Sequence, residues 1–162
     1  MNDRSEPQRL TLAQGDDRLA FGALRAIVGF HIARAAVTTY DAFERHLGTP
    51  FELRKVEFSL LMLLLANEGV SPKPLARALR ITAPKLTQLL DRLQHRGLLE
   101  RRPNPQDGRS QHVMLTSEGH RLAERAGVAA EGMERELLSR LSPAEHAMLI
   151  ELLGKLSGPP AA

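Results

Sequence analysis

The sequence predicts a mainly α-helical protein with a small β wing, a winged helix-turn-helix flanked by long N- and C-terminal helices. Between residues 71 and 119, two short helical patterns joined by a tight turn precede two strand-like segments around a loop rich in Pro and Gly. On both sides of this region, apolar residues recur at three- and four-residue steps. The chain has no Cys and only 4% aromatic residues, so we expect an aliphatic core without disulfides.

The N-terminal part divides into a tail and two helices. Residues 1–15 are polar and aperiodic, and we expect a disordered tail there. Residues 16–50 predict one long amphipathic helix that ends at Gly48 and Pro50. A second helix, over residues 53–68, is apolar nearly all round and should be buried.

Two short helices then form the predicted helix-turn-helix. Ser71 can cap the first, and Pro72 fits its first turn because no N–H is needed there. Thr82 can cap the second, which runs to about Arg96 and stops at Gly97 in a left-handed conformation.

The remaining elements are a wing and two further helices. Strands over residues 98–102 and 111–115 should flank a loop, which places the wing at 98–115 and the whole winged domain at 51–116. Thr116 or Ser117 should cap a helix reaching about Leu141, and Ser142 with Glu145 forms a capping box for the last one. Residues 117–158 therefore predict a C-terminal pair of dimerisation helices, matching the N-terminal dimerisation helix at 16–50.

Positive charge gathers in the predicted winged domain. Residues 71–112 contain nine basic and three acidic side chains, a net charge of +6 in a chain whose total is +3. A basic segment on an acidic body is typical of a module that binds a polyanion such as double-stranded DNA.

The second helix of the pair has two distinct faces. Its leucines fall on one stripe, whereas Lys85, Thr87, Gln88 and Arg92 lie on or beside the opposite side. Gln can pair with adenine, the Thr methyl can contact thymine, and Lys can reach guanine or phosphate. This pattern predicts a recognition helix in the major groove.

The wing loop adds a further candidate contact. Arg109 lies at the tip of this loop and can enter a narrow minor groove of the DNA, where the negative potential favours an Arg side chain. Asp107 and Gly108 are expected to shape the wing, with Asp107 holding a nearby Arg.

The residues from Glu57 to Leu122 resemble the MarR (multiple antibiotic resistance regulator) family of bacterial transcription factors. The matching stretches are EFSLLMLL, PLARALRITAPKLTQLLDRLQHRGLLERR and DGRSQHVMLTSEGHRL. The resemblance implies a homodimer with interlocked terminal helices, and two winged domains that read a near-palindromic operator. A homodimer is also expected from the residues alone, because so small a winged domain cannot cover both long apolar helix faces.

The resemblance also assigns individual positions. Lys85, Thr87 and Gln88 match the base-reading part of the recognition helix, and Arg109, followed by Ser110, matches the wing arginine. Pro72, Lys73 and Thr82 would lie by the phosphate backbone. Pro74, Pro84 and Lys85 depart from the residues common in the family, which bears on the operator sequence.

Three classes of protein compete with a DNA-binding regulator. No catalytic motif such as G-x-S-x-G or H-E-x-x-H is present, so an enzyme is not expected. A winged helix can instead serve as a protein–protein interaction module. The six scattered His residues leave open a metal-responsive regulator, although we expect no metal site and no cofactor.

Further expectations concern effector control and cellular location. The family often binds small aromatic or phenolic acids, and His31, Arg34 and Tyr40 on the first helix are candidates for such an effector. The expected function is a repressor that ligand binding releases. Residues 60–66, the longest apolar run, fall far short of the roughly 20 residues of a membrane span, so we expect a cytoplasmic protein.

Overall fold

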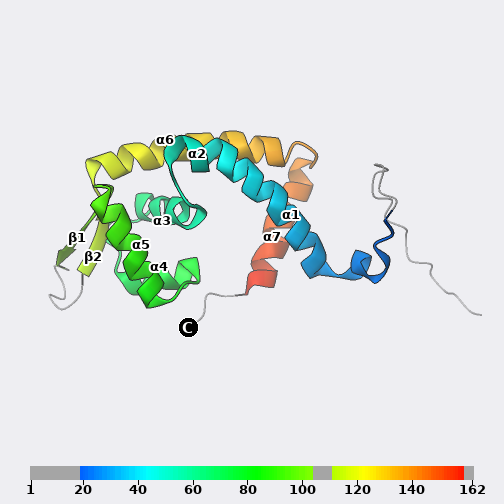
Figure 1. Ribbon diagram of the computed structural model, residues 1–162, viewed down its shortest axis with the longest axis horizontal. Coiled ribbons are helices and arrows are strands. Elements are labelled where there is room, and N and C mark those ends of the chain that lie inside the picture. Colours follow the sequence, from blue (N-terminus) through cyan, green and yellow to red (C-terminus); the bar gives the residue numbers. More distant parts are fainter. Residues whose placement is uncertain (1–18, 104–110, 159–162) are drawn as a thin grey trace, which may run out of the picture. The chain divides into compact units, whose positions relative to one another are not determined.

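The computed structural model describes residues 19–103 and 111–158, which divide into two compact units at Ala35 and Ala36 (Figure 1). The predicted tail over residues 1–15 lies outside the described residues. The first unit holds a 3-10 helix, Gly22–Ala26, and the beginning of α1, Val28–Phe43. The second holds the rest of α1 and every later element.

The first helix begins later than predicted. Gly22 has a φ of 50°, a left-handed conformation that glycine adopts without strain, and Ile27 is extended. These two residues interrupt the predicted helix over 16–50, so its first regular α-helical residue is Val28.

The end predicted for this helix is also wrong. A π-helical turn, Glu44–Gly48, follows α1 and leads directly into α2, Thr49–Phe51. Pro50 lies in the first turn of α2, where a missing N–H is tolerated. The chain leaves the helix at Glu52, which is left-handed with a φ of 52°.

Three helices and a small sheet hold more than half of the buried core of the second unit. These are α3 (Lys55–Leu65), α4 (Pro72–Leu79) and α5 (Ala83–His95), which lie beside the wing strands in Figure 1. The prediction that α3 is buried is confirmed by Leu60, Leu61 and Leu64, each at most 3% exposed. It ends at Leu65, three residues earlier than expected.

The wing is a two-stranded antiparallel sheet. β1 (Leu99–Pro103) pairs with β2 (Gln111–Leu115), with Leu99 opposite Leu115 and Pro103 opposite Gln111. Val70 exchanges two backbone hydrogen bonds with Val113, at 3.2 and 2.9 Å, and so ties the segment before α4 to the sheet.

Two helices complete the second unit. α6 (Ser117–Leu137) packs on α3 and ends four residues before the predicted Leu141, and α7 (Pro143–Ser157) follows. The Thr116 hydroxyl accepts a hydrogen bond from the Gly119 N–H at 3.0 Å and donates one to the Gly97 carbonyl at 2.6 Å. The capping box at Ser142 is confirmed, with the Glu145 carboxylate 2.8 Å from the Ser142 N–H.

Candidate DNA-binding surface

The recognition helix α5 has the two faces that the sequence predicts. Its four leucines, Leu86, Leu89, Leu90 and Leu93, are each at most 2% exposed. Lys85, Thr87 and Gln88 are all exposed. Because the buried stripe fixes the rotation of the helix about its axis, these three side chains turn away from the core.

The starts of α4 and α5 carry the other predicted contacts of the helix-turn-helix. Lys73 and Thr82 are exposed and Pro72 is half-buried. Ser71 and Thr82 occupy the N-cap positions, but neither side chain makes a capping hydrogen bond. Among the described residues, Lys73 and Lys85 have no hydrogen bond or ion pair, so both ammonium groups face solvent.

The Thr87 hydroxyl is bonded within its own helix. The Thr87 Oγ1 donates to the Ala83 carbonyl one turn earlier, at 3.1 Å. This bond uses the hydroxyl proton, whereas the methyl group remains free and suits the C5-methyl of thymine.

Arg92 lies beside the exposed face of α5 but turns toward the protein. Its Nε is 2.9 Å from Glu57 Oε1, and its side chain is 37% exposed. The contact is an ion pair rather than an aligned hydrogen bond, since the Nε–H finds no acceptor among the described residues. The role of Glu57 was not predicted; the signal in the sequence was a single carboxylate in a mostly apolar helix.

A second ion pair joins the wing to the recognition helix. Arg101 Nη2 of β1 lies 2.6 Å from Asp91 Oδ1 of α5. An Asp-to-Arg contact was expected to shape the wing, but from Asp107. Asp107, Gly108, Arg109 and Ser110 lie outside the described residues; in the described part of the wing, Arg101 pairs with Asp91 of α5 and Arg102 pairs with Glu100 of β1.

The predicted effector residues occupy two different surroundings. In the first unit, the Arg34 guanidinium lies 4.9 Å from the centre of the Phe21 ring, and His31 Nε2 donates to the Arg25 carbonyl at 2.9 Å. In the second unit, Lys55 Nζ lies 3.8 Å from the centre of the Tyr40 ring. Each of the three side chains therefore already has a partner within its own unit.

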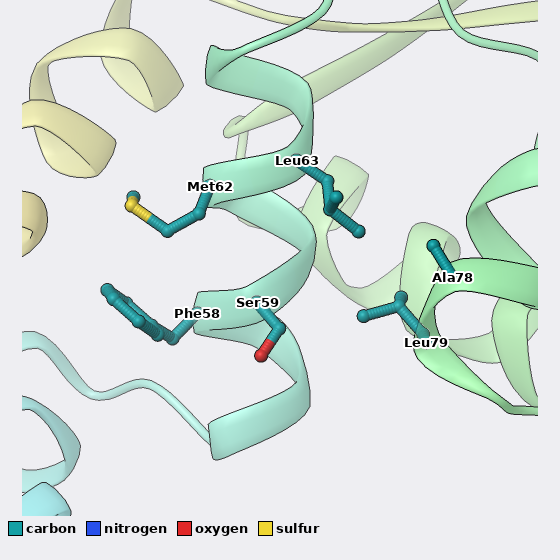
Figure 2. A pocket seen from close by; sticks show the side chains of 6 residues that line it. All are labelled: Phe58, Ser59, Met62, Leu63, Ala78 and Leu79. Atoms are coloured by element: carbon teal, nitrogen blue, oxygen red, sulfur yellow. The ribbon is translucent and has the colours of Figure 1, made fainter. Parts of the chain in front are cut away.

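An apolar pocket lies between α3 and α4. It has a volume of about 520 Å³ and is lined by Phe58, Ser59, Met62, Leu63, Ala78 and Leu79. Figure 2 shows Leu63 pointing toward Ala78 and Leu79, while Phe58 and Met62 project from another side of α3. No charged side chain belongs to this lining, and the Ser59 hydroxyl donates to the Lys55 carbonyl of its own helix.

Neither a metal site nor a membrane span is found in the described ranges, 19–103 and 111–158. Within them, no three His, Asp or Glu side chains gather as a metal site would require. No helix there is both long and apolar enough to cross a membrane.

Comparison with known proteins agrees with this geometry. The model of the MarR family matches residues 51–110. The multiple antibiotic resistance protein MarR of Escherichia coli is 31% identical over 109 residues, covering 67% of this chain and 76% of that protein. Among solved structures, the transcriptional repressor CouR bound to a 23-mer DNA duplex superposes with a TM-score of 0.80 at 31% identity, covering 86% of this chain and 99% of CouR.

A ligand-bound structure is also similar. The PcaV transcriptional regulator of Streptomyces coelicolor, in complex with its natural ligand, gives a TM-score of 0.77 at 25% identity, covering 86% of this chain and 97% of PcaV. With a polarised recognition helix, a wing and these relatives, the chain belongs to the MarR family and is a DNA-binding transcriptional regulator, not an enzyme.

Proposed function

We propose that this regulator is a homodimeric repressor that binds a near-palindromic operator and is released by a small aromatic effector. The proposal rests on one observation: the chain has both a recognition helix that faces solvent and a C-terminal helix whose apolar side chains are uncovered. The first supplies DNA contact, and the second requires a protein partner.

One uncovered apolar face lies on α7. This helix has no buried residue, and its large apolar side chains are 40–62% exposed: Met148, Leu149, Ile150, Leu152, Leu153 and Leu156. A contiguous apolar surface of this kind marks a protein–protein contact. The partner is a second copy of the chain, because in a twofold dimer each copy presents the same apolar face to the other.

In this arrangement the terminal helices, residues 16–50 and 117–158, form the dimer, and residues 51–116 form the DNA-binding domain. A twofold axis then presents two α5 helices to adjacent major grooves, about 34 Å apart, and makes the operator a near-palindrome. Lys85, Thr87 and Gln88 read bases, Pro72, Lys73 and Thr82 lie along the phosphates, and Arg109 with Ser110 reaches the minor groove.

The pocket between α3 and α4 supports an effector. Its volume of about 520 Å³ lies within the range of roughly 300–1,000 Å³ typical of small-molecule sites. The lining is apolar, and Leu63 points across it toward Ala78 and Leu79, which suits the apolar ring of an aromatic ligand. A ligand wedged between α3 and α4 would shift the helix-turn-helix, and so could weaken operator binding.

The effector hypothesis is tested by filling the pocket. Ala78→Leu places a larger side chain in the lining, and Ala144→Leu, on the exposed first turn of α7, is the matched control. In thermal melting with a panel of hydroxybenzoates and hydroxycinnamates, at least one compound should raise the melting temperature of the wild type and of the control, but not that of Ala78→Leu. Equal stabilisation of Ala78→Leu would place the effector elsewhere, and variants of His31, Arg34 and Tyr40 would then locate it.

The repressor hypothesis is tested in cells. A reporter gene placed behind the promoter of the chain's own locus should be silenced by the wild type and released by a Gln88→Ala, Lys85→Ala double variant. Higher expression with the wild type than with the double variant would make the protein an activator.

A further inference from the structure

Glu57 is, among the described residues, the one charged side chain that is buried, at 2% exposure. Its Oε2 accepts a hydrogen bond from the Arg54 N–H at 2.7 Å, at the start of α3. Its Oε1 lies 2.9 Å from Arg92 Nε, and its Oε2 lies 4.0 Å from Arg96 Nη1. Both arginines come from the C-terminal half of α5 or its end. One carboxylate thus joins α3 to the recognition helix.

The same cluster extends to the end of the long N-terminal helical segment. Arg96 donates to the Glu52 carbonyl at 2.9 Å and approaches the Phe51 carbonyl at 3.4 Å. These carbonyls belong to the last residue of α2 and the left-handed residue that follows it. Glu57 and Arg96 therefore connect three elements: α2, the first turn of α3 and the end of α5.

A buried ion pair is a weak source of stability, because the loss of solvation offsets most of the attraction between the charges. Its geometry, however, is specific: a carboxylate with fixed partners permits one register between the elements that it joins. In this chain those elements are the recognition helix and the end of the helix that leads to the dimer contact.

We infer that Glu57 is a positioning residue for operator recognition, holding α5 at a fixed orientation against α2 and α3. This inference rests on the proposed homodimer, because the orientation matters most when two recognition helices must meet two half-sites together. Glu57 is buried and touches no DNA; it acts through Arg92 and Arg96. The three exposed side chains of α5 keep their chemistry when Glu57 changes, but their placement becomes less defined.

The test uses the full chain and a DNA duplex that the wild type selects from a random library. Glu57→Gln is the variant, because the Gln oxygen can still accept from the Arg54 N–H while the negative charge facing the arginines is lost. Glu131→Gln, an exposed position on α6, removes the same charge and is the matched control. Affinity is measured for the selected duplex and for an unrelated duplex of equal length, each over a series of salt concentrations.

We expect Glu57→Gln to bind the selected duplex about tenfold more weakly, the size of one lost base contact, with less than twofold change for the unrelated duplex. The slope of affinity against salt should stay unchanged, because the number of phosphate contacts is the same. Glu131→Gln should match the wild type on both duplexes. Equal losses on both duplexes, or no loss on either, would overturn the inference.

A second variant keeps the inference falsifiable if Glu57→Gln fails to fold. Arg96→Gln removes the link to Glu52 and Phe51 but leaves Glu57 bonded at Arg54 and facing Arg92. Its affinity for the selected duplex should fall more than its affinity for the unrelated duplex. An equal loss on both duplexes would again contradict the positioning role. Sedimentation of each protein separates this inference from the proposed function: a monomeric wild type would refute the dimer, whereas a dimeric wild type with unaltered variants would refute only the role of Glu57.

Discussion

At the scale of single residues, the glycine of the LTSEG stretch is required by a close backbone approach. A Cβ on Gly119 would lie 1.8 Å from the Leu98 carbonyl oxygen, which is backbone and cannot swing away. Thr116 fastens the same junction through its bonds to Gly97 and Gly119. The start of α6 therefore packs directly against the backbone just before β1.

Gly119→Ala should therefore destabilise the protein by about 1–3 kcal/mol or more, the usual cost of overpacking. Gly132→Ala, also within α6 and with no atom within 4 Å of the added Cβ, should instead stabilise it by roughly 0.5–1 kcal/mol through helix propensity. Urea unfolding at one protein concentration measures both. Similar effects of the two substitutions would contradict this account of Gly119.

Glu136 should make the stability of the protein depend on pH in the acidic range. Hydrogen bonds from Arg45 and then His46, at 2.6 and 2.7 Å, lower the pKa of the Glu136 carboxyl from 4.5 to about 2. A depressed folded-state pKa adds stability above the unfolded value, and this contribution is lost as the pH falls from about 4.5 toward 2. The difference in urea midpoint between the wild type and Glu136→Gln should thus be constant near neutral pH and shrink below about 4.5. A difference that did not vary with pH would contradict the ion pair.

At the scale of elements, the proposed contacts assign base reading to α5 and a phosphate contact to Lys73 at the start of α4. Gln88→Ala should weaken binding to the selected duplex by about 1–3 kcal/mol and leave the salt slope unchanged. Gln94→Ala, an exposed Gln on the same helix near its C-terminal end, is the control and should change affinity by less than twofold. Comparable losses for both Gln variants would mean that the register of α5 in the groove is different.

Lys73 should behave differently, because a phosphate contact carries no sequence information. Lys73→Ala should weaken the selected and unrelated duplexes alike and reduce the slope of log affinity against log salt by about 1 per DNA-contacting lysine removed. Fluorescence anisotropy at several salt concentrations measures this. A loss confined to the selected duplex would instead make Lys73 a base-reading residue.

The elements also show what a sequence can predict. The extent of α5 follows from its leucine stripe, the Thr82 start and the Gly97 stop, because all three signals are local. The path through Gly48 and Pro50 could not be predicted, since both residues are ordinary helix stops, whereas here a π-helical turn leads through Gly48 into α2, whose first turn holds Pro50. The Glu57 cluster was missed because its partners lie 35 or more residues away along the chain.

At the scale of the whole molecule, the proposed dimer depends on the apolar face of α7. Leu153→Glu places a charge on its exposed apolar face, where a partner helix would have to bury it. We expect this variant to sediment as a monomer and to lose binding to the selected duplex. Ala144→Glu adds the same charge in the exposed first turn of α7 and should remain a dimer. A dimeric Leu153→Glu would move the interface away from α7.

The duplexes that the wild-type chain selects from a random library test most directly whether a twofold pair of recognition helices reads DNA. We expect an inverted repeat whose half-site centres lie about 10 base pairs apart, one helical turn. Enrichment of a single half-site without a repeat, or of no sequence at all, would contradict it.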